Sequence, residues 1–216
     1  MTSAVPPGEA PRVLGHRASI NVRKVLWTLD ELALPYALDA WGRGHRDTAD
    51  PAFLALNPAG LVPVLIDGDV VLRESNTICR YLAARAQRHD LLPGAPAARA
   101  RIEQWMDWQA TELNGAWRYA FMALVRDSPS HRDRDAIDAS VRAWNDAMQL
   151  LDAQLASTGG GVAADAFTLA DIPIALSAHR WQRTPMPRPS LPAVDAYLQR
   201  MRARPAAQAH LRDDVP

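Results

Sequence analysis

Apolar residues in the first half of the chain follow a helical spacing in some segments and an extended pattern in others. Residues 20–34 carry apolar side chains at the spacing of an amphipathic helix, and residues 12–16 form a strand-like run before them. Extended character returns in residues 34–40, around Pro35. We therefore predict a strand, a helix and a second strand.

The next segments predict a short helix, a hairpin and another helix. Residues 51–58 have helical character and end in a proline. Residues 61–75 predict two strands joined by a tight turn at Asp67 and Gly68, and residues 74–86 predict a helix. The order strand, helix, strand, helix, strand, strand, helix predicts a small α/β sandwich with a mixed sheet.

Proline and glycine mark a boundary near residues 88–97, and everything after it has helical periodicity. Long helices are expected at residues 98–126 and 132–156, and shorter ones from Leu169 and from Leu191. The second half is therefore predicted to be all helical.

Two segments are rich in proline or glycine and show neither helical nor strand periodicity. Residues 1–11 contain three prolines and a glycine, and we expect a disordered extension there. The run TGGG at residues 158–161 lacks the lysine and the preceding strand of a phosphate-binding loop, so a flexible turn is expected.

Charge and cysteine content narrow the classes of function. Basic and acidic residues balance at 24 each, so nothing in the net charge favours a nucleic acid or an anionic membrane as partner. The single cysteine, Cys79, excludes a disulfide framework and has no companion metal ligands, which fits a reducing compartment. No apolar run approaches the ~20 residues that span a bilayer, and the start is unlike a secretion signal, so a cytoplasmic protein is expected.

Ser19 stands one residue before the predicted first helix. A serine at this place is typical of an N-cap, which stabilises a helix by roughly 1 kcal/mol. The same place also suits an anion, because free amides and the helix dipole attract negative charge. A thiolate is one such anion, since helix N-termini lower thiol pKa values. On this stretch alone the cap is favoured, and both interpretations stay open.

Two further features have the same double interpretation. Pro63 interrupts a strand-like run and predicts an edge or a bulge, unless a cis bond after Val62 turns that backbone outward to pair with a peptide-like ligand. Glu74 and Ser75 open a helix, where an acidic residue compensates the helix dipole. The same pair suits a zwitterion, with Ser75 on its carboxylate and Glu74 on its ammonium group.

One stripe in the helical half mixes aromatic, amide and charged residues. At regular helical spacing the following fall within about a third of the circumference: Asp107, Ala110, Asn114, Trp117, Arg118 and Phe121. Ile102, Trp105 and Leu113 lie on another arc and are core candidates. An aromatic stripe is more often packing than pocket, but this mixture also suits the wall of a cleft.

Four segments together resemble one family: SINVRKVLWTLDELALPY, NPAGLVPVL, ESNTICRYL and TLADIPIA. In order and spacing they are similar to the cytosolic glutathione transferases, in particular bacterial members of the serine type or like the nu class. The resemblance implies a thioredoxin-like glutathione-binding domain at residues 12–88 and an all-helical electrophile-binding domain at residues 97–216. It also implies glutathione as co-substrate without a metal, a small hydrophobic electrophile, and a homodimer.

The resemblance gives the residues of the first half their roles. Ser19 and Asn21 would be catalytic and flank the glutathione sulfur. Val62, ahead of a cis Pro63, would pair its backbone with the cysteinyl unit. The pair Glu74 and Ser75 would hold the γ-glutamyl end. Which residue holds the glycine end, His45 or Arg43, stays open.

In the second half the resemblance is to beta-class bacterial members, through ATEL after Asp107. It implies that Asp107 reaches the glutamyl amine of a neighbouring subunit and that Asn114 lies near the sulfur. Asn114, Trp117, Arg118 and Phe121 would form the electrophile pocket. Thr168 and Asp171 have the spacing of a capping box and would stabilise the fold.

These roles predict a glutathione transferase active in detoxification, which transfers alkyl or aryl groups other than methyl. Two alternatives stay open: a glutathione-dependent disulfide or peroxide reductase, which the pairing of Ser19 with Asn21 suggests, and a non-enzymatic glutathione-binding module. No cysteine or tyrosine stands near position 19, so activation by such a residue is not expected. Cys79 is expected to be a buried small residue.

Overall fold

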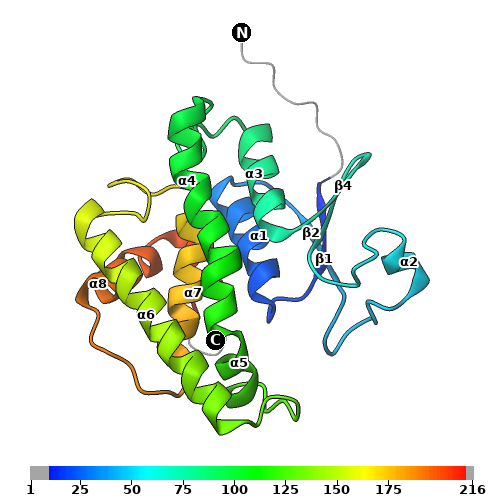
Figure 1. The fold of residues 1–216 in the computed structure, drawn as a ribbon. Coiled ribbons are helices and arrows are strands. Elements are labelled where there is room, and N and C mark those ends of the chain that lie inside the picture. The colour runs from blue at the N-terminus through cyan, green and yellow to red at the C-terminus, as the bar shows by residue number, and fades with distance from the viewer. Residues whose placement is uncertain (1–9, 213–216) are drawn as a thin grey trace. The chain divides into compact units, whose positions relative to one another are not determined.

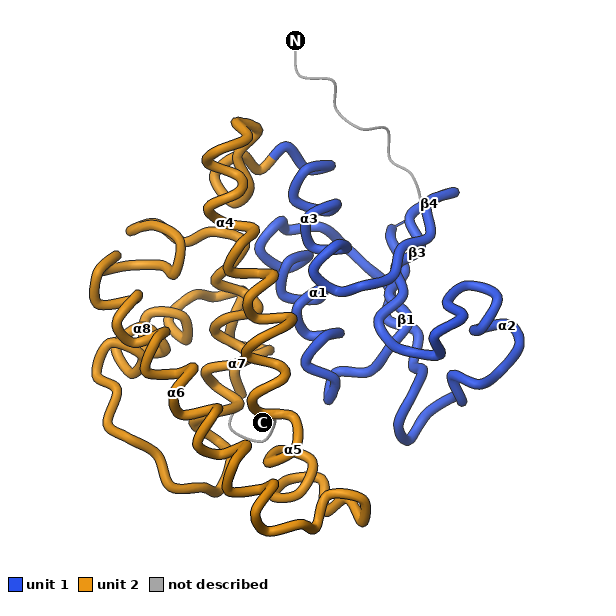
Figure 2. The backbone as a smooth tube through the Cα atoms, in the orientation of Figure 1, with its two compact units in different colours: residues 1–87 blue, residues 88–216 orange. Residues whose placement is uncertain are grey.

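A computed structural model describes residues 10–212, and its chain divides into two compact units, residues 1–87 and residues 88–216 (Figure 2). Residues 1–9 of the predicted extension lie outside the described residues. Pro11 is buried, and its carbonyl accepts a hydrogen bond from the backbone N–H of Ala37 at 3.0 Å.

The first unit is an α/β fold built on a four-stranded mixed sheet, as the sequence predicts (Figure 1). The strand order is β2-β1-β3-β4; β1 and β2 are parallel, and the other neighbouring pairs are antiparallel. Its elements are β1 (Arg12–Gly15), α1 (Ile20–Glu31), β2 (Ala37–Ala40), α2 (Pro51–Leu54), β3 (Val64–Asp67), β4 (Val70–Arg73) and α3 (Ser75–Arg85).

The register of the sheet brings several loops to one of its ends. Gly15 pairs with Ala40, Leu14 pairs with Val64, and Val64 pairs with Arg73. One end of the sheet therefore carries the starts of the segments after β1, β2 and β4. The segment before β3 reaches the sheet at the same end. These segments contain every site residue predicted in the first half of the chain.

The hairpin turn lies one residue later than predicted. Its two central residues are Gly68, at a φ of 63°, and Asp69, while Asp67 is the last residue of β3 and pairs with Val70. Asp67 stays in the strand because its buried carboxylate accepts a hydrogen bond from the hydroxyl of Tyr81 on α3 at 2.9 Å.

The second unit is all helical within the described residues, also as predicted. Its elements are α4 (Pro96–Trp108), a π-helical segment (Gln109–Leu113), α5 (Asn114–Leu124), α6 (Arg134–Thr158), α7 (Asp171–Arg183), α8 (Pro192–Arg202) and a short 3₁₀ turn (Pro205–Ala207). The prediction of one regular helix over residues 98–126 is wrong at its centre, where the π-helical segment adds a residue to the turn.

The glycine run after α6 is a closely packed turn, which corrects the expectation of a flexible one. Gly159 ends the helix at a φ of 78°. A Cβ on Gly160 would lie 1.6 Å from the carbonyl oxygen of Asp165, and the N–H of Gly161 donates to the carbonyl of Ala164 at 2.8 Å. These glycines are required by the close approach of two backbone segments.

Asp171, at the start of α7, ties this turn to the helix. One carboxylate oxygen accepts from the backbone N–H and the hydroxyl of Thr168, at 2.7 and 3.0 Å. The other accepts from the N–H of Val162 at 2.7 Å and from the hydroxyl of Tyr197 at 3.1 Å. Burial raises the pKa of Asp171 from its ordinary value, while these donors oppose the rise. The N–H of Thr168 satisfies half of the predicted capping box, and its hydroxyl donates to the carboxylate.

We expect Asp171→Asn to lower the free energy of unfolding by about 2–4 kcal/mol, because an amide nitrogen replaces an oxygen that accepts two hydrogen bonds. Urea titration followed by circular dichroism measures the loss. Asp152→Asn is the matched control: one oxygen of Asp152 accepts from the N–H of Val194 at 2.9 Å, and an asparagine oxygen can replace it. Equal losses in the two variants would contradict the structural role of Asp171.

Candidate functional site

Ser19 caps α1 at the end of the sheet where the predicted residues gather. Its backbone is extended, with φ −83° and ψ 124°, and its Oγ accepts from the N–H of Val22 at 3.4 Å. This distance is long for a hydrogen bond, so the cap is weak. The Ser19 hydroxyl keeps its own hydrogen for donation, so a cap and an anion contact are compatible here.

Asn21 and Ser75 are brought into contact although they are 54 residues apart. The hydroxyl of Ser75, the first residue of α3, donates to Oδ1 of Asn21 at 3.3 Å. Asn21 lies in the first turn of α1, and α1 and α3 lie side by side (Figure 1). The N-terminal turns of two helices are therefore joined by a polar contact.

Glu74 occupies the N-cap position of α3 in an unusual conformation. Its φ is 67° and its ψ is 108°, and its exposed side chain makes no capping hydrogen bond. A positive φ in a residue with a side chain costs of order 1–3 kcal/mol, and such strain is found preferentially at functional sites. This conformation therefore supports interest in Glu74 beyond simple compensation of the helix dipole.

Val62 and Pro63 are joined by a cis peptide bond, as the family resemblance implies. Within residues 10–212 the backbone of Val62 makes no hydrogen bond to another backbone group. Asn57, which is buried, orders the preceding loop: its amide donates to the carbonyl of Leu61 at 2.7 Å, and its oxygen accepts from the N–H of Ala59 at 3.2 Å.

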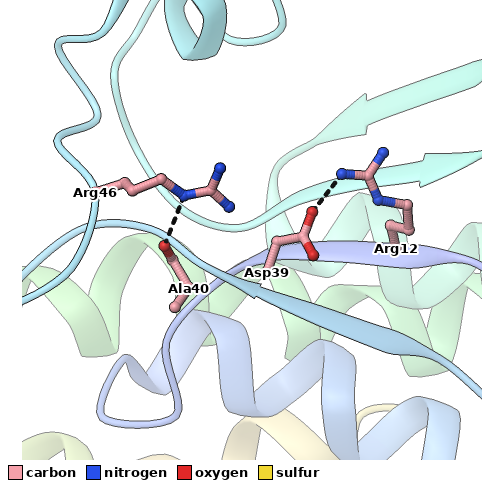
Figure 3. A network of polar contacts seen from close by, with 4 residues as sticks. All are labelled: Arg12, Asp39, Ala40 and Arg46. Carbon is pink, nitrogen blue, oxygen red and sulfur yellow. Dashed lines mark hydrogen bonds and ion pairs between the residues drawn. The ribbon is translucent and has the colours of Figure 1, made fainter.

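The loop after β2 carries cationic side chains at the same end of the sheet. Arg46 of this loop donates to the carbonyl of Ala40, the last residue of β2, at 3.4 Å; within the sheet, Arg12 of β1 pairs with Asp39 of β2 (Figure 3). The guanidinium of Arg46 also lies 4.2 Å from the centre of the Trp41 ring. The Arg46 side chain therefore holds this loop against the end of β2 and against Trp41.

The two residues left open for the glycine end lie in this same loop, and both are exposed. The ring of His45 lies 5.9 Å from the ring of His16, which precedes Ser19. Arg43 makes no ion pair among the described residues.

In the second unit the predicted stripe is interrupted by the π-helical segment. The segment lies between Asp107 and Asn114, so the regular spacing used to align these two residues does not hold. Asn114 and Trp117 are half-buried, Phe121 is 3% exposed, and Arg118 and Asp107 are exposed. Asn114, Trp117 and Phe121 follow the segment and keep their common face of α5.

Trp117 and Phe121 meet edge to face, with ring centres 5.4 Å apart. The guanidinium of Arg180 on α7 lies 4.6 Å from the Trp117 ring centre and 4.0 Å from that of Phe121. Such cation–π contacts strengthen when water is excluded, and Arg180 is 3% exposed. Aromatic stripe and cation therefore form one packed cluster.

Sequence reasoning missed Arg180 and Gln109. Arg180 lies in the last turn of α7, where a basic residue is expected to interact with the helix dipole, so the sequence does not indicate its ring contacts. Gln109 contacts Asn114 only because the turn between them is π-helical. A glutamine five residues before an asparagine is unremarkable in a regular helix.

Cys79 is fully buried in α3, as expected. Burial raises the pKa of its thiol to about 11. A thiolate at this position is therefore scarce at neutral pH, and the residue is unsuited to thiol chemistry. Among residues 10–212 no group of three or more histidine, cysteine, aspartate or glutamate side chains could hold a metal ion.

A mixed α/β unit with a cis-proline loop, followed by an all-helical unit, is the architecture of the glutathione S-transferases, and sequence comparison shows that family. The family models described as glutathione S-transferase N-terminal domain and C-terminal domain match residues 14–90 and 114–205. The chain belongs to the glutathione S-transferase family.

Individual relatives extend over nearly the whole chain. Glutathione S-transferase GstB of Escherichia coli K12 is 41% identical over 196 residues, which cover 90% of this chain and 94% of that protein. Glutathione S-transferase 3 of Zea mays is 34% identical over 208 residues, covering 91% of each. The crystal structure of a theta class glutathione S-transferase from Xanthomonas axonopodis pv. citri, with glutathione bound, has a TM-score of 0.87 and 38% identity, covering 94% of this chain and 97% of that one.

The part of the chain that the structure describes contains no helix long and apolar enough to cross a membrane.

We expect Cys79 to resist thiol reagents in the folded protein. At pH 8, well below a pKa of about 11, a chromogenic disulfide should label less than a tenth of the protein in the time that labels it fully in denaturant. The absorbance of the released thiolate measures the rate. Labelling at similar rates in both conditions would contradict the burial of this thiol.

Proposed function

We propose that this chain is a glutathione S-transferase that ionises the glutathione thiol at the N-terminus of α1 and transfers the sulfur to a small hydrophobic electrophile. The observation that carries the proposal is the position of Ser19, whose hydroxyl caps α1 weakly and keeps a hydrogen to donate. The theta class relative with glutathione bound supports glutathione as the thiol.

The thiol needs only a modest shift to react at neutral pH. An ordinary thiol has a pKa of ~8.5, and each unit of lowering requires about 1.4 kcal/mol of preference for the thiolate. A hydrogen bond from one hydroxyl, together with the interaction with the free amides of the first helical turn, supplies a free energy of this magnitude. The Asn21 side chain, held by Ser75, would lie beside the sulfur. Cys79 takes no part, since it is buried.

The remaining residues of the first unit would bind the peptide portions of glutathione. Glu74 would pair with the γ-glutamyl ammonium group, and Ser75 would donate to the γ-glutamyl carboxylate. The backbone of Val62, ahead of the cis bond to Pro63, would pair with the cysteinyl unit as an added strand does. The exposed carboxylate of Glu74 and the free backbone groups of Val62 support these assignments.

In the reaction the thiol would release its proton to water, and the thiolate would attack an electrophilic carbon. The sulfur–carbon bond forms while the leaving group departs with its bonding pair. Asn114, Trp117, Arg118 and Phe121 would bind the electrophile. In a homodimer, Asp107 would reach the glutamyl amine of the partner's glutathione, which its exposure permits.

The alternatives differ in what they turn over. A glutathione-dependent reductase would reduce a small disulfide or a peroxide and leave aryl halides unchanged. A binding module would be retained on immobilised glutathione and act on none of these compounds. Turnover of an aryl halide with glutathione, in stoichiometric release of halide, would select the transferase.

Replacing Ser19 with alanine should raise the pKa of the bound thiol by about one unit, because the thiolate loses a hydrogen-bond donor. Transfer to an aryl halide below that pKa should slow about tenfold. Ultraviolet absorbance of the bound thiolate against pH measures the shift, and Ser19→Thr, which keeps a hydroxyl, should stay near the parent. A pH profile unchanged in Ser19→Ala would refute the role.

Glu74→Gln should weaken glutathione binding about 10-fold to 100-fold, because a charge-assisted hydrogen bond is lost, and should leave the bound thiol's pKa in place. Calorimetric titration with glutathione measures the affinity. Asp69→Asn removes an exposed charge from the hairpin turn at the opposite end of β4 and serves as the control. If both variants bind equally well, Glu74 does not hold the ammonium group.

A further inference from the structure

The π-helical segment brings two amide side chains into contact that a regular helix would keep apart. Residues five apart lie about 140° apart around an α-helix. Here Nε2 of Gln109 lies 2.9 Å from Oδ1 of Asn114, since the segment Gln109–Leu113 turns with the wider i to i+5 spacing. The hydroxyl of Thr111 donates to the carbonyl of Asp107 at 2.9 Å and satisfies a backbone group of α4 just before this segment.

Trp117 fixes which end of the Asn114 amide faces inward. An indole N–H can only donate, and Nε1 of Trp117 lies 3.0 Å from the Asn114 side chain. The atom that it meets must therefore be the oxygen. The same oxygen receives Gln109, so that contact must come from the Gln109 nitrogen.

Gln109 is in turn fixed by α7. It is fully buried, and its Nε2 also donates to Oγ of Ser177 at 3.0 Å. The Ser177 hydroxyl donates to the carbonyl of Pro173 at 2.8 Å, so it accepts from Gln109. Every donor and acceptor in this series has one consistent direction, which leaves Asn114 a single orientation.

This orientation leaves an N–H of Asn114 available. Its Nδ2 carries two hydrogens, and one is directed at the carbonyl of Ala110 at 3.3 Å. The other has no partner among the described residues, and Asn114 is half-buried. A hydrogen-bond donor therefore remains beside the Trp117 ring, over which the guanidinium of Arg180 lies.

We propose that Gln109 is a positioning residue that holds the amide of Asn114 with its N–H outward, and that this N–H selects electrophiles carrying a hydrogen-bond acceptor such as a nitro or carbonyl oxygen. The inference rests on the proposed transferase function. When the thiolate adds to a nitro-substituted aryl halide, negative charge moves onto the nitro oxygen, where the Asn114 N–H donates to it. The halide then leaves with its bonding pair.

The test compares two electrophiles in Asn114→Asp and Gln109→Glu. The first variant replaces the outward donor with an oxygen. Gln109→Glu places a carboxylate against the Asn114 oxygen. Repulsion between these oxygens favours a rotated Asn114 amide, whose nitrogen faces the carboxylate. Both should lower kcat/KM about tenfold with a nitro-substituted aryl halide and less than about threefold with a benzyl halide that carries no oxygen. Gln104→Glu, an exposed exchange of the same kind on α4, should change neither.

Equal losses on the two electrophiles would show that Gln109 and Asn114 only maintain the fold, and would overturn the selection. So would full activity of both variants on the nitro-substituted halide. Unfolding midpoints of the variants identify any loss that comes from instability.

A second measurement separates this inference from the transferase function. The side-chain amide of Asn114 gives a nitrogen-15 resonance that is identified by its loss in Asn114→Asp. An unreactive nitroaromatic compound should shift this resonance in the parent and not in Gln109→Glu, even if no electrophile is turned over. A resonance that stays in place in the parent would overturn the donor role.

Discussion

The first amides of α1 have no acceptor within the helix, and the chain meets this constraint with a weak cap. Ser19 accepts from Val22 at the long end of hydrogen-bond distances, so it satisfies the helix without using its own hydrogen. A stronger capping group without a hydrogen, such as a carboxylate, would close the same helix end and repel an anion. The sheet register then places the cis-proline loop and the start of α3 at the same end of the unit.

The second unit holds Asp171 and Gln109, both buried, in hydrogen-bond networks. Asp171 receives four hydrogen bonds, and Gln109 bridges Asn114 and Ser177. Complete satisfaction of buried polar groups rigidifies a structure and limits it to one arrangement. Both units therefore combine fixed polar side chains with an available donor, which is the Ser19 hydroxyl in the first unit and one N–H of Asn114 in the second.

The sequence predicts the order of elements well because each depends on local periodicity. The strands and helices of the first unit and the helical second half follow from apolar spacing, proline and glycine. The predicted position of the hairpin turn is one residue too early. Asp67 stays in β3 because it is held by Tyr81, a partner that no local pattern indicates. The packed glycine turn was missed for the same reason, since its constraint comes from Asp165.

The sequence likewise predicts some parts of the candidate site and not others. Ser19 could be placed at a helix start from spacing alone, but the contact between Asn21 and Ser75 depends on the pairing of distant strands. The predicted stripe from Asp107 to Phe121 depends on a regular helix. The π-helical segment changes the angular position of the residues after it relative to those before it. Gln109 and Arg180 gain their partners only through that segment and through α7.

The burial of Cys79 protects the protein's own thiol from changes in the redox state of its surroundings. It is the only cysteine of the chain, and it is sealed within α3. A mixed disulfide between the protein and a small thiol therefore has no place to form on the folded chain. Oxidative stress would act on this protein through the supply of reduced tripeptide and leave the protein's own thiol untouched.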